Sequence, residues 1–196
     1  QVGLNVASDP LMCLAYIGVK GGMVIVSADD PGPISSQTEQ DTRTFAGYAK
    51  LPVFDPSSPE EAYEMIGDAF DYSEKYQTPV LFRPTTRVCH GCAVVDVKEK
   101  IERDMPEGFV KDTSRWVIFP RLSYQNHIKI EERNEKLTSL LSSYEFNKIE
   151  NKNAKKFGIA TGGISYTYVK ESLPEDVRLL KVSTPHPFPE ELAVEF

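Results

Sequence analysis

The sequence has few cysteines, no block of basic residues and no long apolar run. Three cysteines in 196 residues are too few for a disulfide framework, so we expect a reducing, cytoplasmic compartment. Lysine and arginine number 22 against 29 acidic residues, and the resulting net charge of −7 argues against nucleic acid or an anionic membrane as the main partner. The longest apolar runs, 23–26 and 116–119, are far shorter than the roughly 20 residues that span a bilayer, so we expect no transmembrane helix.

Both ends of the sequence fall inside regular patterns. The chain starts at Gln1 without an initiator Met or a polar tail, and it stops at Phe196 within an amphipathic pattern. Residues 1–25 show no basic start followed by an apolar block and a cleavage site, so no secretory signal is expected. We expect the chain to be a fragment of a longer protein.

Predicted strands and helices alternate along the first half of the chain. Ser58-Pro59-Glu60-Glu61 is a strong helix start, because it combines a cap, a first-turn proline and two acids at the positive end of the helix dipole. Patterns of this kind predict strands over 23–28, 51–54 and 78–82 and helices over 9–19, 38–49 and 59–76. Such alternation is typical of a parallel sheet with right-handed crossovers, so the predicted fold class is α/β.

The second half of the chain starts with a change of character. Residues 98–115 are charged and lack a firm periodicity, and 121–143 predict a long, strongly polar helix. The alternation then resumes, with strands over 157–161 and 177–182 and helices over 164–173 and from 189. We therefore expect two α/β units joined by an irregular and helical segment.

Asp29 and Asp30 directly follow the first predicted strand and precede Pro31-Gly32-Pro33. Ligands of open parallel sheets bind beyond the carboxyl ends of the strands, so this polar loop is a candidate site. Two carboxylates at this place could coordinate a metal or accept hydrogen bonds from a ligand's amines. Taken alone, they are more typical of a turn that is capped by Asx-type hydrogen bonds, and the length and polarity of the loop favour the functional interpretation.

Cys89 and Cys92 form a C-x-x-C motif. A single motif supplies two thiolates, whereas structural zinc and iron–sulfur clusters need four ligands, and no second pair with ligand spacing is present. A redox pair would need a helix that begins at the motif and lowers the pKa of one thiol, but the pattern of residues 93–95 predicts a strand. We favour a chance pair of free thiols.

Other signals in the sequence are weaker. Gly162-Gly163, between a predicted strand and helix, could cradle a phosphate, although the full glycine fingerprint is absent. His186 lies among three prolines, which favours a turn or an interdomain contact. Arg43, Arg83 and Arg87 lie near strand ends and suit ion pairing as well as anion binding.

A set of short motifs occurs in one order over nearly the whole chain: VGLNVASDPLM at 2–12, KGG at 20–22, ADDPG at 28–32, SSQ at 35–37, EQD at 39–41, TTRV at 85–88, GIA at 158–160, GISY at 163–166 and TP at 184–185, followed by Pro187 and Pro189. In this order and spacing the chain resembles the large-subunit family of the indolepyruvate:ferredoxin oxidoreductases.

The resemblance implies a thiamine diphosphate-dependent enzyme. Members of this family decarboxylate an aryl 2-oxoacid such as indolepyruvate, pass two electrons through [4Fe-4S] clusters to ferredoxin and release an acyl-CoA. The full enzyme would also use Mg²⁺ and a second (beta) subunit, and it would be an oligomer. By the same resemblance, residues 1–97 are the later part of the domain that binds the pyrimidine ring, 98–150 are a linker and helical connection, and 151–196 begin a transketolase C-terminal-like α/β domain.

The resemblance also assigns site residues. It places Gly3, Leu4 and Asn5 in a loop facing the cofactor ring, and Asp29, Asp30, Gly32, Ser35, Ser36 and Gln37 around the substrate pocket. Relatives specific for pyruvate carry an arginine for the substrate carboxylate where this chain has aspartates, so either another cation binds that group or the site is organised differently.

The resemblance assigns no metal ligand in this chain, and the activating glutamate of the family lies upstream. We therefore expect the fragment to be inactive alone and not to bind thiamine diphosphate tightly. The C-x-x-C motif is not part of the family pattern.

Two alternatives stay open. The full protein could use an aliphatic 2-oxoacid such as pyruvate, or it could be a non-catalytic α/β scaffold that only mediates interactions.

Overall fold

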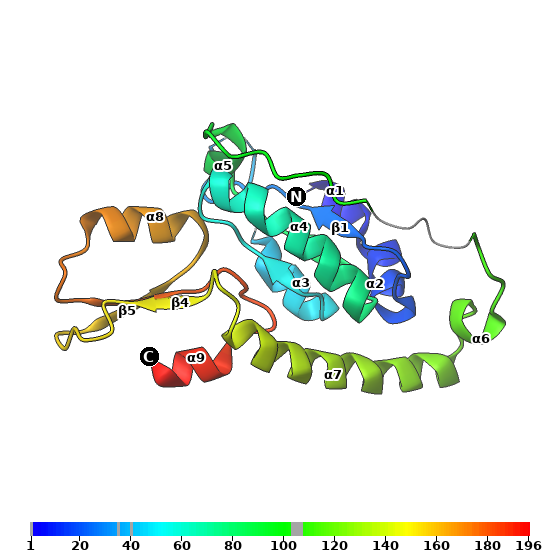
Figure 1. Ribbon diagram of the computed structural model, residues 1–196. Helices are drawn as coiled ribbons and strands as arrows, with labels where there is room; N and C mark the ends of the chain where they lie inside the picture. The colour runs from blue at the N-terminus through cyan, green and yellow to red at the C-terminus, as the bar shows by residue number, and fades with distance from the viewer. Residues whose placement is uncertain (1, 35, 40, 103–107) are drawn as a thin grey trace.

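A computed structural model describes residues 2–34, 36–39, 41–102 and 108–196. Its first sheet has three parallel strands in the order β1-β3-β2, with Ile25 of β1 and Val53 of β2 both paired with Leu81 of β3. The elements up to residue 90 are α1 (Val2–Val6), α2 (Ser8–Ile17), β1 (Val24–Val26), α3 (Thr42–Ala49), β2 (Val53–Phe54), α4 (Pro59–Tyr76), β3 (Val80–Phe82) and α5 (Thr86–His90) (Figure 1). The predicted α/β fold with a parallel sheet is confirmed.

The remaining elements build a second, mixed sheet. They are α6 (Thr113–Trp116), α7 (Pro120–Ser142), β4 (Lys148–Glu150), β5 (Gly158–Thr161), α8 (Gly163–Ser172), β6 (Arg178–Lys181) and α9 (Glu190–Glu195). The strand order is β4-β6-β5, and β6 is parallel to β5 but antiparallel to β4. In Figure 1, α8 lies on one side of this sheet and α9 on the other.

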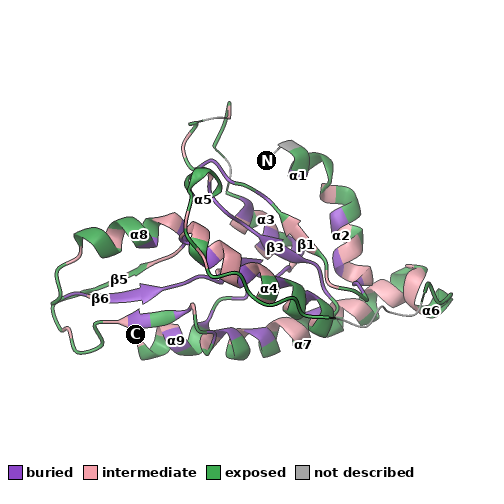
Figure 2. Ribbon diagram, turned by 45° about the horizontal axis from the view of Figure 1, so that its top comes forward, coloured by how far each residue is buried: buried purple, intermediate pink, exposed green. Residues whose placement is uncertain are grey.

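Helices cover both faces of the first sheet. Residues of α1, α2 and α3 form one buried cluster with β2 and β3, and α4 packs with the C-terminal end of α7 in a second cluster. The long helix α7 is therefore more than a polar connection, since Leu137 and Leu141 are fully buried in one cluster with Met65 and Phe82. Figure 2 shows buried positions, in purple, on α7.

Side-chain caps fix where two of the helices begin. Ser58 accepts a hydrogen bond from the backbone N–H of Glu61, so α4 begins at Pro59 as predicted. Asp41 accepts from the N–H of Arg43 and caps α3. The prediction that this second helix starts at residue 38 is therefore wrong, and the described residues before Asp41 belong to the loop.

Several short elements differ from the predictions. Gly3-Leu4-Asn5, expected in a loop, lies in α1, and residues 93–95, expected to be a strand, have no regular structure. The helices α1, α5 and α6 and the strand β4 were not predicted. Among the described residues, no helix is long and apolar enough to cross a bilayer.

The two sheets are joined by main-chain and side-chain contacts. Val53 of β2 forms an isolated antiparallel bridge with His186, and the N–H of Asp55 donates to the carbonyl of Ser183 at 2.8 Å. Next to these bonds, Glu61 of α4 is paired with Lys181 of β6, and both side chains are buried. The first unit and the second sheet therefore share a buried polar interface.

Candidate functional site

Three charged residues meet where the strands of the first sheet end. Asp29 follows β1, Arg83 follows β3 and Asp55 follows β2, and their exposed fractions are 0%, 4% and 1%. Buried charges of this kind are costly unless they are paired and hydrogen-bonded. The hydrogen-bond and ion-pair partners of these three side chains therefore determine whether any of them is available to bind a ligand.

Arg83 is shared between two carboxylates. Its Nε donates to Asp29 Oδ2 at 2.6 Å, and its Nη1 lies 3.3 Å from each carboxylate oxygen of Asp55. Burial raises the pKa of Asp55 to about 6, because desolvation outweighs the attraction of Arg83 and Arg43. The positive charge of Arg83 is already balanced within the chain.

Arg43 is the second cation at this edge. It bonds Asp41 through Nε at 2.8 Å and Nη2 at 2.7 Å, and this pairing lowers the pKa of Asp41. Its Nη1 lies 3.8 Å from Asp55 Oδ2. Both arginines are thus ion-paired, and neither is held free for the carboxylate of a substrate in the described part of the chain.

Asp29 and Asp30 anchor the loop that follows them by accepting hydrogen bonds. Asp29 Oδ2 also accepts from the N–H of Thr42, at the start of α3. Asp30 accepts from the N–H of Ser36 at 2.8 Å and from Thr86 Oγ1 at 3.0 Å. These bonds support the structural alternative for the two carboxylates. Among the described residues, no group of three or more His, Cys, Asp and Glu side chains could hold a metal ion.

The loop itself is largely exposed. Gly32 has a φ of +79°, a conformation that favours glycine, and Ser36 Oγ donates to the carbonyl of Thr38. Gln37 is exposed, and Ser35 lies outside the described residues. The structure brings Asp30 and Ser36 together, but it leaves Gln37 at the surface of the loop.

An apolar groove of about 500 Å³ lies beside this edge, between β1 and the first two helices. Its lining residues are Gly3, Leu4, Ala7, Pro10, Leu11, Leu14, Met23, Ile25, Val26, Ser27 and Ala28. Gly3 and Leu4, two of the expected cofactor residues, therefore share a groove with the residues that precede Asp29. Asn5 is exposed and is not among the lining residues. The space around Gly3 is open, because a Cβ there would meet nothing within 4 Å.

The same edge contains polar atoms with unused hydrogen-bonding capacity. Ser27 Oγ, Asp29 Oδ1, Thr42 Oγ1 and Thr85 Oγ1 are buried without a partner in the described part of the chain. Buried polar groups in native proteins are nearly always hydrogen-bonded. Ser27 combines this feature with a place in the apolar groove, so a group that binds there would find a hydroxyl.

Asp55 is the site residue that sequence reasoning missed. A signal was present, because Asp55-Pro56 follows a predicted strand just as Asp30-Pro31 follows another. The carboxyl ends of parallel strands lie at one edge of a sheet, so the two motifs should have been considered together.

Two other sequence motifs lie away from the groove. Cys89 belongs to the last turn of α5, and partial burial raises the pKa of its thiol, so thiolate formation is disfavoured. At the start of α8, Gly163 has a φ of +53°, and a Cβ there would lie 2.8 Å from Asp55 Oδ1. A carboxylate of the chain already occupies this helix start, which makes it unsuitable for a phosphate.

His186 supports the joint between the two sheets. Its Nδ1 lies 2.8 Å from the carbonyl oxygen of Leu51, and burial lowers its pKa. A neutral imidazole that donates from Nδ1 fits this position and favours the structural interpretation.

Comparisons with known proteins extend over the whole chain. The chain is 44% identical to the indolepyruvate oxidoreductase subunit IorA of Thermococcus kodakarensis, 42% identical to that of Pyrococcus abyssi and 38% identical to that of Archaeoglobus fulgidus. Each comparison covers 100% of this chain and 32% of the relative, so the chain spans about a third of the length of these proteins. No family model matches the chain.

A solved structure has the same fold. It is a 2-oxoglutarate:ferredoxin oxidoreductase from Magnetococcus marinus with 2-oxoglutarate, coenzyme A and succinyl-CoA bound. The TM-score is 0.69 over 98% of this chain and 42% of that chain, with 17% sequence identity. At this identity, the similarity concerns the fold alone.

Proposed function

The chain belongs to the indolepyruvate oxidoreductase subunit IorA family, and we propose on this basis that it forms part of the active site of a 2-oxoacid:ferredoxin oxidoreductase. The complete enzyme would decarboxylate indolepyruvate or another aryl 2-oxoacid, form an acyl-CoA and transfer the electrons to ferredoxin. One observation carries this proposal: Gly3 and Leu4 line the same apolar groove as Ser27 and Ala28, directly before the anchored loop. In this arrangement, the expected cofactor residues adjoin the expected substrate loop.

The groove suits the flat, ring-bearing part of thiamine diphosphate. Leu4, Leu11 and Ile25 give it apolar walls, the space at Gly3 is open, and Ser27 Oγ is a buried hydroxyl without a partner in the described residues. When bound, the cofactor supplies the electron sink for loss of carbon dioxide from the 2-oxoacid. In this chain, Gly3 and Leu4 would contact the ring and Ser27 would offer it a hydrogen bond.

The substrate would enter from the side of the loop. Asp29 and Asp30 hold the base of this loop by their hydrogen bonds, so that Gly32, Ser36 and Gln37 could border the substrate, with Ser35 between them. The apolar lining favours an aryl side chain over a small aliphatic one. Arg43 and Arg83 are ion-paired within the chain, so neither is available to bind the substrate carboxylate.

Other parts of the proposal concern the complete protein. Residues 1–97 would be the later part of a pyrimidine-binding domain, and residues 151–196 the beginning of a transketolase C-terminal-like domain. The remaining two thirds of the subunit, together with a beta subunit, would supply the activating glutamate, the Mg²⁺ site and the [4Fe-4S] clusters. We place the enzyme in the cytoplasm, with CoA and ferredoxin as its other reactants.

Kinetics of the complete two-subunit enzyme test this proposal. Reduction of ferredoxin should depend on CoA and on thiamine diphosphate, and kcat/KM should be higher for indolepyruvate and phenylpyruvate than for pyruvate. A preference for pyruvate would favour the aliphatic alternative. Failure of the complete, cofactor-loaded enzyme to turn over any 2-oxoacid would favour the scaffold.

A further inference from the structure

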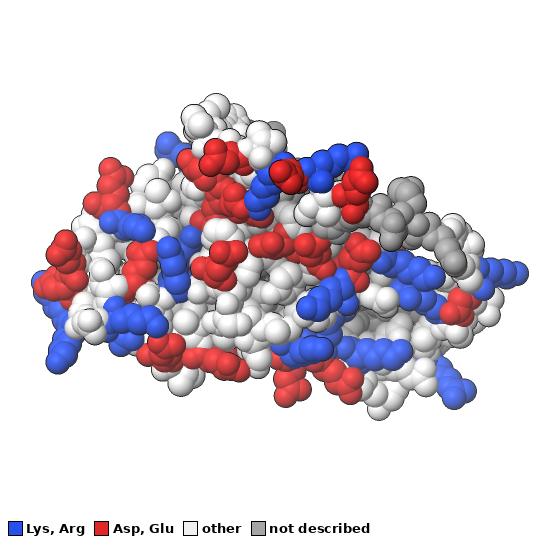
Figure 3. Space-filling view, in the orientation of Figure 1, with Lys and Arg blue, Asp and Glu red and all other residues white. Residues whose placement is uncertain are grey.

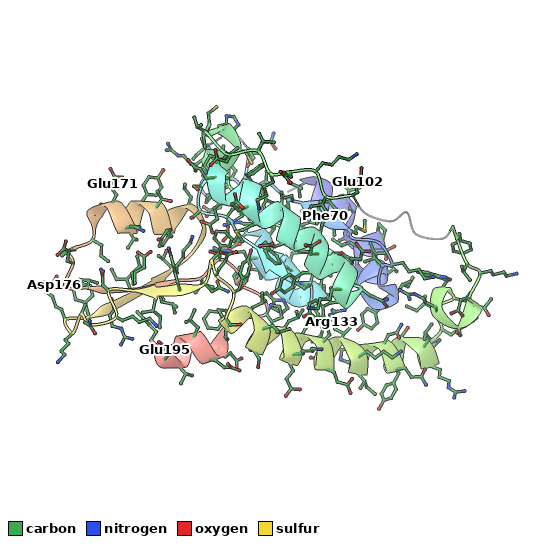
Figure 4. The ribbon with its side chains drawn as sticks, viewed as in Figure 1. Phe70, Glu102, Arg133, Glu171, Asp176 and Glu195 are labelled. Atoms are coloured by element: carbon green, nitrogen blue, oxygen red, sulfur yellow. The ribbon has the colours of Figure 1, made fainter. Side chains whose placement is uncertain are left out.

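A second cavity of about 390 Å³ lies at the opposite end of the first sheet, away from Asp29. It is bordered by the C-terminal ends of α2 and α4, by α6 and by one side of α7. Asn126, Lys129, Ile130 and Arg133 line it from α7, and their spacing of three and four residues places them on one helix face. Figure 4 shows Arg133 between α7 and the helices packed above it.

The charges around this cavity have one sign. Arg115, Lys129 and Arg133 line it, and no acidic residue is among its described lining residues. This is unusual for a chain with a net charge of −7. In Figure 3, blue side chains lie along the side of α7 that faces α2 and α4, and red ones lie along its lower side. Glu131, Glu132 and Glu135 belong to a different concave surface.

The two arginines have few partners for their charge. Arg115 donates to the carbonyl of Val19 at 3.1 Å, and Arg133 donates to the carbonyl of Lys50 at 3.2 Å. Within the described part of the chain, neither guanidinium has a carboxylate within 4 Å. The Nε atom of each is buried and has no acceptor there.

Helix capping explains only part of this arrangement. Val19 follows α2 and Lys50 is the C-cap of α3, so each arginine neutralises the negative end of a helix dipole. One carbonyl satisfies one of the five N–H donors of a guanidinium, and the buried Nε atoms remain without an acceptor. Burial without a neighbouring acid also lowers the pKa of Arg133 to about 10. The Arg115 guanidinium also lies over the Trp116 ring, 4.7 Å from its centroid, but neither arginine has a carboxylate partner in the described part of the chain. Together with Lys129 the two arginines therefore concentrate uncompensated positive charge in one cavity.

We propose that this cavity is a binding site for a small oxyanion, either a phosphate group or a carboxylate, held by Arg115, Arg133 and Lys129. Guanidinium groups bind both kinds of oxyanion by paired N–H···O bonds, and Lys129 adds a point charge at the mouth of the cavity. Tyr16 and Tyr76 also line the cavity and supply ring surfaces for the organic part of a ligand. The site is distinct from the groove at Gly3 and does not depend on the proposed reaction.

Calorimetric titration of the complete subunit tests the proposal, with inorganic phosphate and malonate as separate probes in low-salt buffer. We expect saturable binding of at least one probe, and the preferred probe indicates whether the natural ligand carries a phosphate or a carboxylate. Arg133→Gln should weaken binding about tenfold or more, the ratio expected for loss of one charge-assisted hydrogen bond.

Two further variants control this test. Lys129→Gln changes an exposed residue that caps no helix, so it should fold normally and still weaken binding severalfold. Arg121→Gln removes the same charge from α7 outside the cavity lining and should leave the affinity unchanged. Absence of saturable binding of both probes would overturn the proposal, and so would an equal loss in Lys129→Gln and Arg121→Gln.

Discussion

The buried pair of Glu61 and Lys181 offers a quantitative test of how the two sheets are held together. The exposed fractions of the two residues are 7% and 3%, and Lys181 Nζ lies 2.5 Å from Glu61 Oε2. Ser57 Oγ also donates to Oε2, and Ser183 Oγ donates to Oε1 at 2.9 Å. On its other side, the ammonium group lies 4.4 Å from the centroid of the Tyr166 ring.

Removing one partner of a buried ion pair leaves an uncompensated charge and costs about 3–5 kcal/mol. The loss of unfolding free energy in Lys181→Met should lie near the lower end of this range, about 3 kcal/mol, because two hydroxyl groups still donate to the Glu61 carboxylate. The loss in Glu61→Met should lie near the upper end of the range, because the face of the Tyr166 ring would be the main remaining partner of the Lys181 ammonium group. The double variant should cost less than either single change, since it removes both buried charges.

Urea unfolding followed by far-UV circular dichroism gives the free energy of unfolding of each variant. Lys152→Met is a matched control, because Lys152 pairs with Glu195 at the surface and such pairs contribute at most about 1 kcal/mol. A loss of under 1 kcal/mol in Lys181→Met would refute the reasoning. Additive losses in the double variant would also refute it, because they would mean that the two charges do not interact.

Three further predictions follow from the site. The pKa of Asp55 is raised to about 6 from an ordinary 3.8. The protonated carboxyl therefore stabilises the fold fully below pH 4, and this stabilisation, about 3 kcal/mol in total, is lost as the pH rises through 6. The difference in unfolding free energy between wild type and Asp55→Asn should follow this curve, and a flat difference from pH 4 to 7.5 would contradict it. Replacing residues 35–37 with alanine in the complete enzyme should lower kcat/KM about a hundredfold while the melting temperature changes little, because Ser36 and Gln37 lie outside the core. Unchanged turnover would make the loop an interdomain contact. The isolated chain should show no micromolar site for thiamine diphosphate with Mg²⁺ in calorimetry, and detection of such a site would mean that the cofactor needs no group from the rest of the subunit.

The elements that the sequence predicted well are those with strong local signals. Ser58-Pro59 fixes the start of α4 through a cap and a first-turn proline, and α4 forms where expected. The strand β4 has only three residues and pairs with β6 across a long stretch of sequence, so no local pattern marks it. The core role of α7 rests on a few leucines in an otherwise polar helix, and only the packed structure shows which side they bury.

The sequence predicted where the candidate site lies, but it did not predict the hydrogen bonds and ion pairs within it. Asp29 and Asp30 were identified because they end a strand of a parallel sheet. Their bonds to Arg83, Thr42 and Thr86 join elements far apart in the sequence, so their anchoring role could not be derived from spacing. Gly3-Leu4-Asn5 was expected to be a loop, but it forms one short helix whose Leu4 packs against the core, and this packing is a tertiary effect.

Steady-state kinetics of the complete enzyme with a tryptophan at position 28 test the central claim most directly. Ala28 is exposed and lines the groove directly before Asp29, so Ala28→Trp should narrow the groove on the side of the loop, from which the aryl substrate would enter, without disturbing the core. Val6→Trp is the control, because Val6 is 79% exposed on α1 and is not among the lining residues. We predict that Ala28→Trp lowers kcat/KM for indolepyruvate by at least about tenfold, that it affects pyruvate less, and that Val6→Trp changes neither. Equal kcat/KM values for indolepyruvate in wild type and Ala28→Trp would contradict the assignment of this groove to the active site.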